Sequence, residues 1–257
     1  MIKILVTGAN GQLGSCLQKI APFYNECKFT FKNSNELDIT NKKEVFSVFE
    51  IGKYDYCINC AAYTNVEHAE KEPKIAFQVN AEGVKNLALA CKNFHTGLIH
   101  ISTDYVFDGE KQGPYTIYDH PNPINEYGKS KLLGEQYIKD VFADFLIVRT
   151  SWLYSEFGKN FYKTIIEKSK TEKVLKVTDE QIGCPTNANN LALHLIKKLT
   201  QKNINYGIEH FTDGYSSTWF DFAKKIVIEQ NLQDKVQVVK DRNYRTFVKR
   251  PLNSVLI

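Results

Sequence analysis

The feature that most constrains the fold of this sequence is a short apolar segment followed at once by a glycine-rich turn. Residues 2–7 read Ile-Lys-Ile-Leu-Val-Thr without regular alternation, which predicts a parallel strand covered on both faces. The turn GANGQLG follows at residues 8–14, and residues 15–20 have helical character. Glycines let the main chain approach a pyrophosphate, whose charge a helix N-terminus attracts. The spacing is G-x-x-G-x-x-G, and its place at the first strand–helix junction favours a dinucleotide site over a simple tight turn.

Further strand predictions extend this pattern along the chain. They share short apolar runs separated by helical segments, and they cover residues 27–31, 54–59, 98–102 and 144–149. Alternating strands and helices predict βαβ units with parallel strands. The expected fold class is therefore α/β, with a Rossmann-type doubly wound parallel sheet.

The pattern changes after residue 150, where a smaller C-terminal α/β domain is expected. Residues 1–150 are predicted to form an NAD(P)-binding Rossmann domain, rejoined by about residues 173–200, where a helix returns to the first sheet. Residues 151–172 and 201–257 are predicted to form the substrate-binding domain. Within it, residues 240–250 hold five basic residues against one acid, which fits either a solvated face or a phosphate-binding segment.

Composition excludes several classes of partner. The net charge of +4 is spread over 257 residues, whereas nucleic-acid binding calls for a concentrated basic stripe. No apolar run approaches the ~20 residues of a membrane span. The N-terminal MIKILVTGAN lacks the pattern of a secretory signal, so we expect a cytoplasmic protein with neither nucleic acid nor membrane as a partner.

The cysteines are expected to be reduced thiols, because the chain shows no export signal. Cys57 and Cys60 form a C-x-x-C, a spacing also found in redox and zinc sites. In a strand, residues three apart point to opposite faces, and no second pair follows to complete a zinc site. The two thiols are therefore predicted to be core residues, and no metal site is expected.

Tyr127 and Lys131 lie four residues apart and therefore on one face of a helix, a spacing that fits either an acid–base pair or two surface residues that meet by chance. A phenol has an ordinary pKa of about 10, and a nearby ammonium favours the phenolate. At an effective dielectric constant near 20, a charge ~4 Å away is worth about 4 kcal/mol, or roughly three pKa units. A hydroxyl at the end of the fourth predicted strand, where Ser102 and Thr103 lie, could reach the same carbonyl oxygen as the phenol.

The end of the second strand bears on which dinucleotide is bound. Folds that prefer NAD place an acid there to bind the ribose 2′-hydroxyl, but this chain has no carboxylate before Glu36. Lys32 could instead meet a 2′-phosphate, so NADPH is favoured and NADH stays possible. Asp38 fits either a position beside the adenine or support of a helix cap at Thr40 or Asn41.

Motifs in a fixed order carry a family resemblance. GANGQLG, AAYT at 61–64, STDYVF at 102–107 and YGKSK at 127–131 resemble the extended short-chain dehydrogenase/reductases. STDYVFDG, RTSWLY, GKNF, DEQIGCPT and RPLNS narrow the resemblance to the dTDP-4-dehydrorhamnose reductase family, over nearly the whole chain. That family reduces the 4-keto group of dTDP-4-dehydro-L-rhamnose to dTDP-L-rhamnose, a precursor of bacterial surface polysaccharides. The implied substrate is a nucleotide sugar; a homodimer is possible, and a need for Mg²⁺ is open.

The resemblance also implies residue roles. Tyr127 is expected to protonate the 4-keto oxygen, Lys131 to lower the pKa of Tyr127 and bind the nicotinamide ribose, and Thr103 to orient the ketone. The expected substrate-binding residues are Thr103, Asp104, Trp152 and Arg250. The expected cofactor-binding residues are Gly8, Asn10, Gly11, Gln12, Leu13, Gly14, Lys32, Asp38, Ile39, Ala61, Ala62, Tyr63, Thr64, Ser102, Tyr127 and Lys131.

The chain departs from the family pattern at its end, and other functions are also considered for it. It stops at residues 253–257, where the family continues into an amphipathic helix, so the pocket rim and any oligomer interface are open to question. A dehydratase would need adjacent carboxylates after the threonine, but Tyr105 follows Asp104. A 4-epimerase would retain NAD. A non-catalytic dinucleotide-binding subunit, of the methionine adenosyltransferase regulatory type, would not need Thr103, Tyr127 and Lys131 together.

Overall fold

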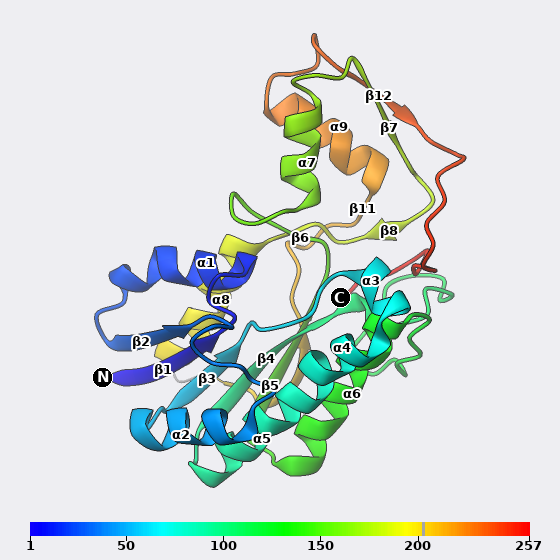
Figure 1. The fold of residues 1–257 in the computed structure, drawn as a ribbon. Coiled ribbons are helices and arrows are strands. Elements are labelled where there is room, and N and C mark those ends of the chain that lie inside the picture. Colours follow the sequence, from blue (N-terminus) through cyan, green and yellow to red (C-terminus); the bar gives the residue numbers. More distant parts are fainter. Residues whose placement is uncertain (202–203) are drawn as a thin grey trace.

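A parallel six-stranded sheet lies at the centre of the computed structural model, which describes residues 1–201 and 204–257 (Figure 1). The strand order is β10-β5-β4-β3-β1-β2. The strands are β1 (Ile2–Thr7), β2 (Cys27–Lys32), β3 (Tyr56–Asn59), β4 (Gly97–Thr103), β5 (Phe145–Thr150) and β10 (Gly207–His210). Because β1 lies between β2 and β3, the direction of winding reverses there, and such a switch point opens a crevice at the carboxyl ends of the strands. The predicted doubly wound α/β fold is confirmed.

Helices cover both faces of the sheet (Figure 1). One face packs against α1 (Gln12–Ile20) and α8 (Ala188–Thr200), and the other against α2 (Lys42–Gly52), α5 (Val84–Asn93) and α6 (Glu126–Val141). A short 3-10 turn, η1 (Ala21–Phe23), follows α1. The chain thus forms three layers, with its core on either side of the sheet.

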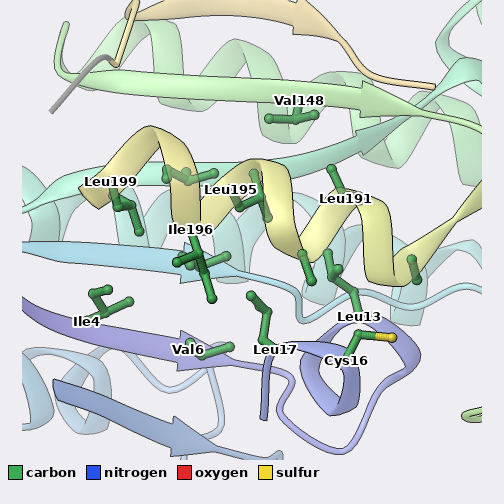
Figure 2. Close-up of a cluster of buried hydrophobic side chains, with 14 of the residues drawn as sticks. Ile4, Val6, Leu13, Cys16, Leu17, Val148, Leu191, Leu195, Ile196 and Leu199 are labelled. Atoms are coloured by element: carbon green, nitrogen blue, oxygen red, sulfur yellow. The ribbon is translucent and has the colours of Figure 1, made fainter. Parts of the chain in front are cut away.

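Apolar residues at helical spacing place α8 on the sheet (Figure 2). Leu191, Leu195 and Leu199 repeat every four residues and are fully buried. They belong to the same cluster as Ile4 and Val6 of β1, which are also fully buried. Truncating one such leucine to alanine typically costs about 2–5 kcal/mol. This packing returns the chain to the first sheet, where the sequence placed a returning helix.

The long helical stretch after β3 is broken near Pro73. It consists of α3 (Val66–Lys71), α4 (Pro73–Phe77), a π-helical turn η2 (Gln78–Gly83) and then α5. Asn80 in the π turn is fully buried and bonds the main-chain N–H and carbonyl of Tyr63 and the hydroxyl of Ser130. The buried amide is therefore satisfied, and it ties the loop after β3 to α6.

A smaller α/β region lies beyond the carboxyl edge of the sheet (Figure 1). Its helices, α7 (Phe161–Lys168) and α9 (Trp219–Glu229), share a core with the parallel pair β7 (Val174–Val177) and β12 (Gln237–Lys240). Two-residue pairs join it to the sheet: β6 (Leu153–Tyr154) with β9 (Thr186–Asn187), and β8 (Ile182–Gly183) with β11 (Ser217–Thr218). Across the described ranges, no helix has the length and apolarity that a bilayer crossing requires.

Two strands correct the predicted boundaries between the regions. β7 falls in the segment 173–200 that was assigned to the Rossmann domain, but it pairs with β12 in the smaller region. β10 falls in the segment 201–257 assigned to the substrate domain, but it pairs with β5 at the edge of the main sheet. An edge strand is covered less completely, so Gly207–His210 mixes polar and apolar residues and lacks the continuous apolar run of the central strands.

Candidate active site

A continuous crevice runs along the carboxyl edge of the sheet at the switch point. It consists of a cavity of about 310 Å³ and a larger one of about 610 Å³. Both are lined by Asn10 and Gly11 from the turn after β1 and by Cys60 and Ala62 after β3. The glycine turn therefore lies in the middle of an elongated site, as a dinucleotide would require.

The glycine turn is shaped for close approach of the main chain. Gly8 has a φ of +66°, and a Cβ there would lie 2.5 Å from the nitrogen of Ala61. Gly11 caps α1 without a side-chain hydrogen bond, and the first turn of α1 holds no acid. The first N–H groups of a helix lack intrahelical partners, so this end of α1 fits a pyrophosphate.

The structure distributes most of the predicted site residues over the two cavities. Those that line the smaller cavity are Gly8, Asn10, Gly11, Asp38, Ile39, Ala61, Ala62 and Tyr63. Those that line the larger cavity are Asn10, Gly11, Gln12, Leu13, Ala62, Thr64, Ser102, Thr103, Asp104, Tyr127, Lys131 and Trp152. Gly14, Lys32 and Arg250 line neither.

The end of β2 presents polar rather than charged groups. Asn33 and Ser34 line the smaller cavity, in place of the expected Lys32. The carboxylate of Asp38 accepts from the N–H and hydroxyl of Thr40 at 2.9 and 2.8 Å, while Asn41 caps α2. Asp38 thus both supports the local turn and lines the cavity, so the two readings of this residue are compatible.

The first turn of α6 presents Tyr127 to the larger cavity. Asn125 caps the helix by accepting from the N–H of Gly128 at 2.8 Å. A Cβ on Gly128 would lie 2.1 Å from the carbonyl oxygen of Tyr105, so only glycine lets the helix approach the segment after β4 this closely. Lys131 follows one turn later, so the two predicted partners line one cavity.

The expected direction of the pKa shift at Tyr127 is wrong in this structure. Burial raises the pKa of Tyr127, the Thr103 hydroxyl lowers it, and Asp104 raises it. The Nζ of Lys131 donates to the Ile101 carbonyl at 2.7 Å. Burial in turn lowers the pKa of Lys131 to about 8.

Asp104 is a buried carboxyl group at the same cavity. Its Oδ1 accepts from the Thr103 hydroxyl at 3.0 Å, and its Oδ2 has no partner among the described residues. Burial raises the pKa of Asp104 to about 6, against hydrogen bonds from Ser254 and Thr103. Above that pH Asp104 is an ionised acceptor.

The residues predicted at the substrate occupy two neighbouring cavities. Trp152 lines the larger one and stacks on Trp219, with ring centroids 3.5 Å apart and planes 7° apart. Arg250 and Trp219 line a separate cavity of about 310 Å³ beside α7, where the Arg250 Nη2 donates to Glu67 at 2.9 Å. Arg250 is therefore not in the cavity of Tyr127.

The sequence did not single out several residues that hold the site. Asn160 donates to Gln12 at 2.7 Å, so the N-cap of α7 contacts the glycine turn; GKNF was noted only as part of a resemblance. Thr7, Asn59 and His100 form a buried polar row across β1, β3 and β4. The sequence signal that could have identified this row is the presence of polar residues inside otherwise apolar strands.

Contacts show how three other side chains near the site are engaged. The Ser102 hydroxyl donates to Glu135 beneath the cavity, so its side chain is committed to the core. Cys57 and Cys60 pack on opposite sides of the sheet, as strand geometry predicted. In residues 1–201 and 204–257, no cluster of three or more His, Cys, Asp or Glu side chains could hold a metal ion.

The sheet, the glycine turn at its switch point and the cavity with Thr103, Tyr127 and Lys131 define the class. The chain is an NAD(P)-dependent oxidoreductase of the extended short-chain dehydrogenase/reductase kind. Residues 2–257 match the family described as the RmlD substrate binding domain, and the chain belongs to this family, that of the dTDP-4-dehydrorhamnose reductases.

Individual relatives agree over the full length. The chain is 40% identical to the dTDP-4-dehydrorhamnose reductase of Aggregatibacter actinomycetemcomitans, covering 100% of this chain and 90% of the relative. The crystal structure of a dTDP-4-dehydrorhamnose reductase from Clostridium acetobutylicum has a TM-score of 0.94 and 41% identity, covering 100% and 90% of the two chains. That from Bacillus anthracis, in complex with NADP, has a TM-score of 0.94 and 39% identity, covering 100% and 91%.

Proposed function

We propose that this chain reduces the 4-keto group of dTDP-4-dehydro-L-rhamnose to dTDP-L-rhamnose with NADPH. One observation carries the proposal: Tyr127, Thr103 and Lys131 line a single cavity that continues into the glycine turn. Relatives named for this activity match the whole chain, which makes this substrate the best supported within the class.

The crevice fits a dinucleotide whose pyrophosphate lies at α1. The uncapped N-terminus of α1 leaves the main-chain N–H groups of its first turn free to bind it, and the turn at Gly8 lets the main chain approach closely. Asn33 and Ser34 follow β2 and line the smaller cavity at the position where a fold that prefers NAD carries an acid, and these uncharged side chains favour a 2′-phosphate over the bare hydroxyl pair of NAD. When bound, the reduced nicotinamide supplies the hydride.

Tyr127 is the proposed general acid. Because burial raises its pKa, the phenol stays protonated at neutral pH and can give its proton to the sugar oxygen as that oxygen gains charge. The hydroxyl of Thr103 lowers the pKa of Tyr127 and would orient the same oxygen by a hydrogen bond. In the ammonium form, Lys131 would stabilise the tyrosinate that remains.

The substrate would extend from this cavity toward the smaller region. The carboxylate of Asp104, which lines this cavity, is the proposed acceptor for a sugar hydroxyl. The stacked rings of Trp152 and Trp219 form the wall between the two cavities, since each ring lines one of them. Arg250 in the second cavity is the proposed contact for the diphosphate; it would have to share or leave its bond to Glu67.

The test is a spectrophotometric assay of purified protein with NADPH and dTDP-4-dehydro-L-rhamnose, with the product identified by chromatography. NADPH consumption that yields dTDP-L-rhamnose is expected. Tyr127→Phe should lower kcat by roughly 10²–10⁴-fold and leave NADPH affinity nearly unchanged. Tyr137→Phe is the matched control, because this tyrosine lies on the same helix but bonds the exposed Glu82.

Two outcomes would refute the proposal. A protein that purifies with tightly bound NAD and returns the hydride to its substrate would be an epimerase. A protein that binds NADPH but turns over no nucleotide sugar would be a non-catalytic dinucleotide-binding subunit.

A further inference from the structure

Tyr105 lies between the two residues that the proposed function assigns to the sugar ketone and to the diphosphate. It belongs to the 3-10 turn η3 (Asp104–Val106), which Thr103 caps by accepting from the N–H of Tyr105 at 3.1 Å. Tyr105 lines neither the cavity of Tyr127 nor that of Arg250. Its side chain nevertheless contacts the ring of Tyr127 and lies beside the charge of Arg250.

The ring of Tyr105 packs edge-on against the ring of Tyr127. The ring centroids are 5.7 Å apart and the planes meet at 76°, which is the T-shaped arrangement that aromatic pairs prefer. The main chain of Tyr105 is fixed at the same place, because its carbonyl oxygen lies against Gly128. Among the described residues, Tyr105 provides the only aromatic contact to Tyr127. The orientation of the Tyr127 phenol therefore depends on this ring.

The hydroxyl of Tyr105 lies beside Arg250. Burial raises the pKa of Tyr105 to about 12, and the positive charge of Arg250 opposes this rise. The Nη2 of Arg250 donates to Glu67 at 2.9 Å, while its Nε has no hydrogen-bond partner among the described residues. A guanidinium has only donors, so the phenol oxygen faces it as an acceptor.

A second connection joins the same two parts of the chain. Asn125, the N-cap of α6, accepts from the N–H of Gly128 at 2.8 Å and donates through Nδ2 to the carbonyl of Lys249 at 3.0 Å. The residue before Arg250 is thus tied to the helical turn that carries Tyr127. Main-chain and side-chain contacts together set the position of this segment relative to Tyr127.

We propose that Tyr105 is a positioning residue, whose ring orients the phenol of Tyr127 toward the ketone and whose hydroxyl holds the guanidinium of Arg250 toward the diphosphate. One rigid side chain then sets the separation of the two groups. A misplacement of about 1 Å can cost roughly 10² in rate, so this orientation is worth a measurable factor. The inference rests on the proposed function, because it concerns the placement of that substrate.

The test compares Tyr105→Phe with Tyr105→Leu, using NADPH and dTDP-4-dehydro-L-rhamnose in single-turnover and steady-state kinetics. Phe keeps the ring and loses the hydroxyl, so the single-turnover rate should stay within about twofold while KM for the nucleotide sugar rises about fivefold. Leu also loses the ring, so the single-turnover rate should fall about tenfold or more. Tyr118→Leu, which removes a tyrosine that is 91% exposed in the loop before α6, should change neither quantity.

A double-mutant cycle tests the connection to Arg250. If the hydroxyl acts through the guanidinium, Tyr105→Phe should raise KM no further in an Arg250→Met background. Additive effects would overturn the inference, and so would a Tyr105→Leu variant with the wild-type single-turnover rate. Both Tyr105 variants should bind NADPH with wild-type affinity in a fluorescence titration. A loss of that affinity in Tyr105→Leu would show that the ring only supports the fold, which would also overturn the inference.

The failure of this inference can be distinguished from failure of the proposed function. A wild-type protein without turnover would refute the proposed function, whereas the ring contact can be measured without turnover in ¹³C-tyrosine-labelled protein. The ring signals of Tyr127, assigned with Tyr127→Phe, should be displaced by the facing ring, stay displaced in Tyr105→Phe and shift in Tyr105→Leu. Tyr127 signals that are the same in Tyr105→Leu as in the wild type would overturn the inference by themselves.

Discussion

A buried ion pair beneath the site leads to a quantitative prediction. Arg149 of β5 donates from Nε and Nη2 to the two carboxylate oxygens of Glu135 at 3.0 and 2.6 Å, and the Ser102 hydroxyl also donates to Glu135. Glu135 is 0% and Arg149 1% exposed. The pair fixes α6, which carries Tyr127, against β4 and β5.

Glu135→Gln keeps the shape of the side chain but leaves the Arg149 charge buried without a counter-ion. Removing one partner of a buried pair costs about 3–5 kcal/mol, and Gln still offers one acceptor oxygen, so we expect a loss of about 3 kcal/mol. The double variant Glu135→Leu/Arg149→Met removes both charges and should be less destabilised than the single one.

Urea unfolding at neutral pH, followed by circular dichroism and tryptophan fluorescence, measures these free energies. Lys129→Gln is the control, because it breaks an exposed pair with Glu126 on the same helix and should cost about 0–1 kcal/mol. If Glu135→Gln unfolds within about 1 kcal/mol of the wild type, or the double variant is the less stable one, the buried charge is not what holds these elements together.

Three further predictions concern the cavity. The pKa of Asp104 is raised to about 6 in the folded protein, from an unfolded value near 4. The folded state therefore binds this proton more tightly, which stabilises the fold at low pH by about 3 kcal/mol. This contribution is lost as the pH rises through 6. Asp104→Asn should remove this pH dependence from the free energy of unfolding, measured with urea at several pH values. If the free energies of the variant and the wild type changed with pH in parallel, the prediction would be contradicted. Asn160→Asp keeps the cap of α7 but loses the donor to Gln12. We therefore expect NADPH to bind about fivefold more weakly in a fluorescence titration. An unchanged affinity would show that this hydrogen bond does not contribute to NADPH binding. Gly128→Ala places a methyl group 2.1 Å from the Tyr105 carbonyl and should lower both the melting temperature and kcat; a variant with wild-type kcat would show that the helix need not approach so closely.

The structure decided how the functional groups face one another. Spacing along α6 placed Tyr127 and Lys131 on one face, but it gave no information about the Ile101 carbonyl and His100 that engage the amine. The pKa of Tyr127 was therefore expected to fall, whereas burial raises it. Desolvation depends on what surrounds a group on all sides, and that is not contained in a local spacing.

Local sequence patterns predicted the main strands and helices and their order. The apolar runs and the turn at Gly8 predicted the parallel sheet and its crevice, because strand periodicity and glycine conformation are local properties. Only the tertiary structure showed that β10 completes the main sheet, that Arg250 lies in a neighbouring cavity and that Thr7, Asn59 and His100 form one buried row. These depend on contacts between residues far apart in the chain, whose free energies are decided by packing rather than by any short stretch of sequence.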